Sequence, residues 1–279
     1  MRAQLTISVN AGKWLIAKAI CNFPEVKHAL KKGRVLLKGG TTVSCIAEEL
    51  AGIKLEICGR ITKRGTVAGK SKNCGAPHSI LITDRGWENV DDRLLEVAHD
   101  LGPEDVVILG ANAVDSEGNA AMMAGSPGGG PPGKVMTVLM TEGANIIVAA
   151  GLEKLIPGRV YDAVSAAGRK NCDFSMGMAV GLMPIKGKVI TELEAIKAIA
   201  DVKVTVIGKG GIEGGEGSTT VVVEGNESQI KTVIQELLEA SKKHISGNPE
   251  SLIECRPGCS GCKDDLACYY SSKNRFKPL

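Results

Sequence analysis

LLKGGTTVSCIAEEL, residues 36–50, joins a short apolar run to a helical pattern through two glycines and two threonines. The apolar run is typical of a buried strand, and Gly52 stands where the helix that follows would end. A strand that turns directly into a helix is the repeating unit of α/β folds. The segment therefore predicts an α/β protein with a glycine-rich turn at the carboxyl end of one strand.

Strand and helix patterns alternate on both sides of this segment. Helices are expected at residues 24–33, 42–52, 90–101 and 133–144, and strands at 34–39, 54–61, 79–84, 105–111 and 145–151. This alternation predicts a parallel or mixed sheet with helices on both faces. Ligands of such sheets bind at the carboxyl ends of the strands.

Three regions are expected along the chain. Residues 1–184 form the α/β domain, residues 185–247 a small α+β lid module, and residues 248–279 a tail rich in cysteine. The lid module begins with a capping box at Thr191 and Glu194. Its middle, GKGGIEGGEG at residues 208–217, is too rich in glycine for regular structure and predicts a hairpin loop.

Composition excludes several classes of function. The chain has 279 residues, of which 43% are hydrophobic and only 3% aromatic, so the core is aliphatic. A net charge of +3 without a basic stripe gives no reason to expect a nucleic-acid partner. The N-terminus resembles neither a signal peptide nor a membrane span, so we expect a cytoplasmic protein with no membrane partner. Assembly into a homo-oligomer is compatible with this composition.

The turn at residues 39–42 has two interpretations. The first turn of a helix offers unpaired N–H groups and a positive dipole end, which suit an anion. In the second interpretation Thr41 or Thr42 caps the helix with its own oxygen, and glycine only permits the turn.

Three segments together resemble one superfamily. They are residues 36–50, residues 106–130 (VVILGANAVDSEGNAAMMAGSPGGG) and residues 145–158 (NIIVAAGLEKLIPG). In this order they resemble the ligand loops of the ribose-5-phosphate isomerase A, DeoR-type sensor and CoA-transferase superfamily, over about residues 1–184. The resemblance implies a small anionic ligand and favours the anion interpretation of the turn. The binding residues that it implies are Gly39, Gly40, Thr41, Thr42, Asn112, Asp115 and Lys154.

The chain departs from the isomerases at their catalytic acids. Leu109, Asn112 and Gly133 take the positions of three carboxylates, and none of them can accept a proton from carbon. Asp115 could replace an acid, but in the stretch DSEGN it is also a typical turn former. The sequence thus predicts a protein that binds a phosphorylated or carboxylated metabolite, with isomerase-like or acyl-transfer-like chemistry undecided. A ligand sensor without catalysis and an iron–sulfur redox protein are the alternatives.

The stretch GSPGGGPPGKV, residues 125–135, contains part of a phosphate-binding loop. Val135 stands where nucleotide-binding loops need Ser or Thr for magnesium, so NTP hydrolysis is not expected. A glycine loop that leads into a helix still suits an anion, and the residues proposed to bind it are Gly129, Gly130 and Lys134. In the alternative, Lys134 is an ordinary solvated lysine.

Eight of the nine cysteines fall into two groups. Cys21, Cys45, Cys58 and Cys172 are scattered and are expected to be small core residues. Cys255, Cys259, Cys262 and Cys268 lie within fourteen residues of the tail. Four thiols in one short run favour a [4Fe–4S] cluster, with zinc as the alternative cofactor. Disulfides are disfavoured because no signal directs the chain to an oxidising compartment.

Overall fold

The computed structural model describes residues 1–69, 75–258 and 265–271. Its centre is a mixed six-stranded sheet in the order β12-β10-β7-β2-β5-β6. The strands are β2 (Val35–Lys38), β5 (Ser79–Thr83), β6 (Gly86–Asn89), β7 (Val106–Leu109), β10 (Asn145–Ala149) and β12 (Lys188–Ile190). The first four strands of that order run parallel, β5 runs antiparallel to β2, and β6 runs antiparallel to β5. The predicted mixed α/β sheet is therefore confirmed.

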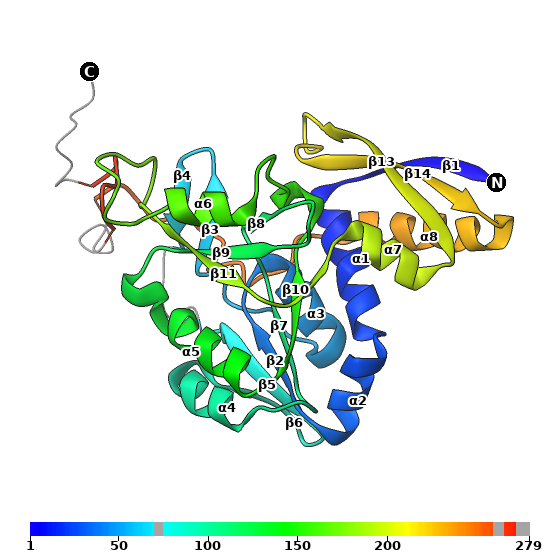
Figure 1. Cartoon of the computed structure of the whole chain (residues 1–279). Coiled ribbons are helices and arrows are strands. Elements are labelled where there is room, and N and C mark those ends of the chain that lie inside the picture. The colour runs from blue at the N-terminus through cyan, green and yellow to red at the C-terminus, as the bar shows by residue number, and fades with distance from the viewer. Residues whose placement is uncertain (70–74, 259–264, 272–279) are drawn as a thin grey trace.

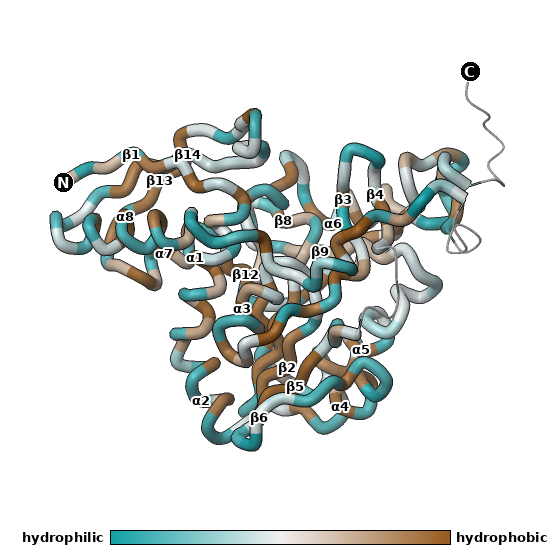
Figure 2. The backbone as a smooth tube through the Cα atoms, turned by 180° about the vertical axis from the view of Figure 1, so that it is seen from behind, coloured by the Kyte–Doolittle hydropathy of each residue, from teal (hydrophilic) through white to brown (hydrophobic). Residues whose placement is uncertain are grey.

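Helices cover both faces of this sheet (Figure 1). On one face lie α1 (Val9–Cys21), α2 (Pro24–Lys32) and α3 (Thr41–Ala51), and on the other α4 (Leu94–Asp100) and α5 (Gly130–Thr141). Alternate residues of β2 serve the two cores: Val35 and Leu37 pack with the first group, and Leu36 packs with the second. Figure 2 shows the apolar residues concentrated along the central strands.

A second sheet, in the order β1-β14-β13, lies beyond α1. It consists of β1 (Arg2–Ile7), β13 (Val202–Gly210) and β14 (Ser218–Gly225), and it packs with α7 (Glu192–Ile199) and α8 (Glu227–Lys242). The capping box of α7 agrees with the sequence prediction, and so does the hairpin, except that residues 208–210 of the predicted loop belong to β13. The predicted boundary at residue 185 does not separate a lid, because β1 completes this sheet and Val221 packs in the same core as Val35.

Smaller elements surround the carboxyl ends of the central strands. They are a sheet of β8 (Ala113–Val114), β9 (Ala120–Ala124) and β11 (Gly181–Ile185), a hairpin of β3 (Gly59–Thr62) and β4 (Gly65–Ala68), α6 (Val160–Ala166), and the 3-10 turns η1 (Asp91–Arg93), η2 (Pro127–Gly129) and η3 (Leu152–Lys154). The strand expected over residues 54–61 begins only at Gly59. Within the described ranges, no helix combines the length and apolar character needed to cross a bilayer.

Candidate functional site

The loops that follow three neighbouring strands meet at one edge of the central sheet. Lys38 at the end of β2 pairs with Leu109 at the end of β7, which in turn pairs with Val148 of β10. Because these strands are parallel and end level, residues 39–42, 110–115 and 150–154 emerge side by side. The edge therefore gathers the three segments that the sequence singled out.

The turn after β2 leaves the start of α3 without a side-chain cap. Gly40 is the N-cap residue with φ of +134°, and neither threonine forms a capping hydrogen bond. Gly39 is required for another reason, because a Cβ at this position would lie 2.1 Å from the His78 ring. The cap interpretation thus has no support in the geometry, whereas the N–H groups of the first turn suit an anion.

Asn112 and Asp115 are engaged in holding their own loop. The Asn112 side-chain oxygen accepts from the Met123 N–H at 2.9 Å. Asp115 is buried and accepts from the N–H groups of Val160 and Asn119, both at 2.9 Å. Burial alone would raise the pKa of Asp115, but these hydrogen bonds outweigh it and lower the pKa. The geometry thus favours the turn-forming alternative over a catalytic acid.

The glycine loop before α5 lies on the other face of the sheet from α3. Gly129 has φ of +79° and is the N-cap of α5, again without a side-chain cap. Lys134 is exposed, and no contact between described residues connects it to the turn at residues 39–42. The structure does not bring these two predicted anion sites into one pocket.

Buried charges gather instead between the first helix and the loops after β10 and β12. Lys13 of α1 is only 7% exposed, and its Nζ lies 3.5 Å from Glu153 Oε1. Lys154 Nζ lies 4.0 Å from the same oxygen. Glu192, the first residue of α7, is 3% exposed and accepts from the Leu152 N–H at 2.7 Å. Of these four residues, the sequence prediction named only Lys154.

Two glycines make the space that holds the carboxylates. A Cβ on Gly151 would lie 2.1 Å from Glu153 Oε2 and 2.8 Å from Glu192 Oε1. A Cβ on Gly12 would lie 2.5 Å from the same Glu192 oxygen. Any other residue at either position would therefore displace a carboxylate. The two acids occupy one small hollow, and we call Glu153 and Glu192 the glutamate pair.

The electrostatics of the glutamate pair separate its two members. Burial, together with the nearby Glu153 charge, raises the pKa of Glu192 to about 7. Both Glu153 oxygens are buried and lack a hydrogen bond among the described residues, although Lys13 neutralises their charge. Burial also lowers the pKa of Lys154, against the opposing effect of Glu153. An acid of raised pKa beside a second buried acid has the arrangement of a general acid with a general base.

The hairpin of β13 and β14 approaches this cluster. A Cβ on Gly217, beside β14, would lie 3.5 Å from the Glu153 Cβ, and Lys209 of β13 lowers the pKa of Glu192. Lys209 Nζ is held at 2.9 Å from the Thr219 hydroxyl. The glycine-rich loop predicted from sequence therefore lies next to the buried charges.

Sequence reasoning missed Lys13 and Glu192 for different reasons. Glu192 lies in the sequence TELE, where the recognisable pattern is the capping box, and the carboxylate of that capping box belongs to Glu194. Lys13 is a charged residue within a helix whose apolar pattern is otherwise typical of a buried core helix. A buried charge at a core position of α1 was the available signal, because lysine is almost never fully buried without a partner.

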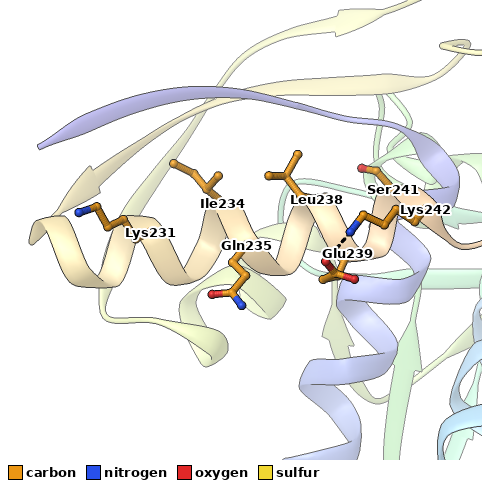
Figure 3. Close-up of a pocket in the computed structure, with 7 residues that line it drawn as sticks. All are labelled: Lys231, Ile234, Gln235, Leu238, Glu239, Ser241 and Lys242. Atoms are coloured by element: carbon orange, nitrogen blue, oxygen red, sulfur yellow. Dashed lines mark hydrogen bonds and ion pairs between the residues drawn. The ribbon is translucent and has the colours of Figure 1, made fainter.

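A shallow trough along α8 is not part of this site (Figure 3). Its lining side chains all come from that one helix. Lys242 and Glu239 at its rim form an exposed ion pair at 2.6 Å. Nothing about the trough points to a ligand.

The cysteine prediction is only partly within the described residues. Cys255 is half-buried and Cys268 buried, whereas Cys259 and Cys262 lie outside the described residues. Among residues 1–69, 75–258 and 265–271, no group of three or more His, Cys, Asp and Glu could hold a metal ion. Of the scattered cysteines, Cys58 and Cys172 are exposed, so the prediction that they are core residues is wrong.

Comparisons with known proteins give no further guide to these residues. Neither the family models nor the curated proteins nor the solved structures compared with this chain include a match.

Proposed function

We propose that the protein binds a small phosphorylated or carboxylated metabolite at the carboxyl edge of the sheet and moves a proton between its carbon atoms. The chemistry would be that of a sugar-phosphate isomerase. The glutamate pair is the observation that carries this proposal, because it supplies the acid and the base that the resemblance alone could not supply.

The anionic group would bind at the start of α3. Its unpaired N–H groups and the helix dipole favour negative charge, and the hydroxyls of Thr41 and Thr42 stand in the same turn. Lys13 lies on α1, which packs against α3, and its Nζ is 3.5 Å from Glu153 of the glutamate pair. Burial raises the pKa of Cys45, one turn into α3, to about 12, and the Lys13 ammonium opposes that shift.

The proton transfer would use the two carboxyl groups in complementary states. Ionised Glu153 would take a proton from the carbon beside a carbonyl, and the C–H electrons would form the C=C bond of an enediol. Protonated Glu192 would give its proton to the carbonyl oxygen. Glu153 would then give its proton to the former carbonyl carbon, while Glu192 takes the hydroxyl proton from the carbon that lost its hydrogen, so that the new carbonyl forms there and both carboxyl groups return to their starting states.

A thermal-shift screen over sugar phosphates, nucleotides and CoA esters tests the binding step. A ligand that binds the folded state raises the melting temperature. We expect sugar phosphates to do so, and we expect Lys13→Met to reduce the shift. A screen in which only nucleotides or CoA esters stabilise the protein would contradict the proposed ligand class.

We also propose that Cys255, Cys259, Cys262 and Cys268 hold a [4Fe–4S] cluster, with zinc as the alternative. Contacts at the two ends of this segment support the proposal. Gly258 N–H donates to the Tyr270 carbonyl at 3.2 Å, so these two residues lie side by side. Arg64 donates to the Cys255 carbonyl at 2.6 Å, and its guanidinium lies 4.4 Å from the centre of the Tyr270 ring. Four thiols from one short run of sequence suit a single metal centre.

A further inference from the structure

Lys38 is a buried cation without a conventional partner. It is the last residue of β2, and its side chain follows Leu36 onto the face that α4 and α5 cover, away from Lys13. Lys38 is 6% exposed. Among the described residues, its Nζ contacts only the Met122 sulfur, at 3.8 Å. Burying an ammonium beside a thioether is costly unless an anion lies near it.

The His78 imidazole lies beside an exposed thiol. His78 Nδ1 is 2.9 Å from the Glu56 carbonyl oxygen and 3.3 Å from Cys58 Sγ. A carbonyl oxygen only accepts, so Nδ1 carries the proton. The Cys58 sulfur is then a second acceptor for that N–H, which favours the thiolate, whereas the Glu56 carboxylate oxygen 4.0 Å from the sulfur favours the thiol.

The ring is held firmly in this position. The backbone N–H groups of His78 and Ser79 donate to the Asp91 carboxylate at 2.8 and 2.7 Å, respectively. The ring also packs against Gly39. His78 therefore presents Nδ1–H to the sulfur in a fixed direction.

The charges agree with this geometry. Burial lowers the pKa of Lys38 to about 8, while Cys58 and Asp91 act in the opposite direction. Burial and the Lys38 charge lower the pKa of His78 to about 4. Near neutral pH the lysine is thus cationic and the histidine neutral, and Lys38 is the countercharge available to a Cys58 thiolate.

We propose that Cys58 is a nucleophilic thiolate, stabilised by Lys38 and positioned by His78, at a reactive site separate from the glutamate pair. Thiolates with a cationic neighbour and access to solvent are the reactive cysteines of proteins. Cys58 is exposed, so a small electrophile can reach it.

The neighbouring groups also select the class of electrophile. Neutral His78 directs its Nδ1–H at the Glu56 carbonyl oxygen and is a poor acid. The leaving group must therefore depart without accepting a proton. Thioesters are the biological electrophiles of this kind. The Cys58 sulfur would use a lone pair to form a bond to the acyl carbon. The original carbon–sulfur bond would break, and its electron pair would leave with the departing thiolate.

Site-resolved labelling of the whole reduced protein tests this proposal. The probes are iodoacetamide and a small acetyl thioester, with the modified peptides counted by mass spectrometry. Cys172 is also exposed and serves as the control within the same chain. Because one unit of thiol pKa changes the thiolate fraction about tenfold, we expect Cys58 to react at least about tenfold faster than Cys172 near neutral pH.

Lys38→Met removes the cation and keeps a long side chain in the buried position. We expect it to slow Cys58 to the rate of Cys172, to leave Cys172 unchanged and to leave the melting temperature equal or higher. Equal rates for the two cysteines in the unmodified sequence would overturn the proposal. So would an unchanged Cys58 rate in the folded Lys38→Met variant, or an acetyl group found on Lys38 instead of Cys58.

Discussion

Glu153 and Glu192 place their carboxylates against the same point of the backbone, where a Cβ on Gly151 would lie 2.1 Å from one and 2.8 Å from the other. They come from the loops after β10 and β12, adjacent strands of the sheet. Two carboxylates this close cannot both be ionised without a large cost, so a proton remains on the pair. Lys13 stabilises the remaining negative charge. A shared proton at the carboxyl edge of an α/β sheet is the basis of the proposed chemistry.

Gly151→Ala should disrupt the glutamate pair through sterics alone. The new methyl group would overlap both carboxylates, so we expect a loss of about 1–3 kcal/mol in the free energy of unfolding, measured with urea. Gly158→Ala is the matched control in the same loop, because nothing lies within 4 Å of a Cβ there. Equal stabilities for the two variants would show that the carboxylates do not occupy the hollow.

The pH dependence of stability should reveal the raised pKa of Glu192. This acid keeps its proton in the folded state up to about pH 7, whereas the unfolded chain releases it near the ordinary value of 4.5. Folded protein therefore binds more protons than unfolded protein between these values, and its stability falls as pH rises through this window. Glu192→Gln should remove this contribution, which is on the order of 3 kcal/mol. The check is urea unfolding at several pH values.

In that experiment, the stability of Glu192→Gln relative to the original protein should increase across the window. A difference that stays constant with pH would mean that Glu192 titrates at its ordinary value.

Phosphate or sulfate should raise the melting temperature through the turn at residues 39–42. Replacing both threonines, Thr41→Val with Thr42→Val, should abolish this shift because valine keeps the shape and removes the hydroxyls. The control is Thr137→Val with Thr141→Val, on the exposed part of α5. If the first double variant keeps the full shift, the anion binds elsewhere.

Protein isolated without oxygen should be brown if the tail holds an iron–sulfur cluster. We expect a broad absorption near about 400 nm that disappears in Cys259→Ser, because the cluster loses a thiolate ligand. Cys172→Ser, outside the tail, should keep the colour. Colourless protein with one equivalent of zinc would support the alternative metal.

Local patterns allowed the sequence to predict the sheet and its helices, and long-range pairing explains most of what it missed. The run from β2 into α3 is continuous in the chain, so its strand, turn and helix could be recognised directly. In contrast, β1 pairs with β14, with Arg2 opposite Glu224. A local pattern cannot show that β1 pairs with β14. For this reason the sequence prediction placed the start of the lid module at residue 185 and left β1 out of it.

The candidate site divides in the same way. The turn at residues 39–42 and Lys154 could be found from the resemblance, and the role of Asp115 in its turn from the stretch DSEGN. The glutamate pair could not be found, because one helix and two strands separate Glu153 from Glu192 in the chain, and the two meet only in the hollow beside Gly151. The contact between Cys58 and His78 likewise joins residues 20 positions apart, and no local pattern predicts it.

The glutamate pair also changes what is expected of ribose 5-phosphate. Leu109, Asn112 and Gly133 offer no base for the interconversion of ribose 5-phosphate and ribulose 5-phosphate. Glu153 could now supply one, so both compounds belong in the test together with other aldose and ketose phosphates.

Exchange of carbon-bound hydrogen in D2O, followed by proton NMR, measures the proposed proton transfer directly. We expect the protein to exchange the hydrogen beside the carbonyl of at least one sugar phosphate that stabilises it. Glu153→Gln should slow this exchange by about 100-fold or more while the thermal shift remains, because the base is lost and the anion site is kept. Glu96→Gln, an exposed acid on α4, should exchange at the original rate. A sugar phosphate whose thermal shift depends on Thr41 and Thr42, yet whose hydrogens never exchange, would contradict catalysis and leave a binding protein.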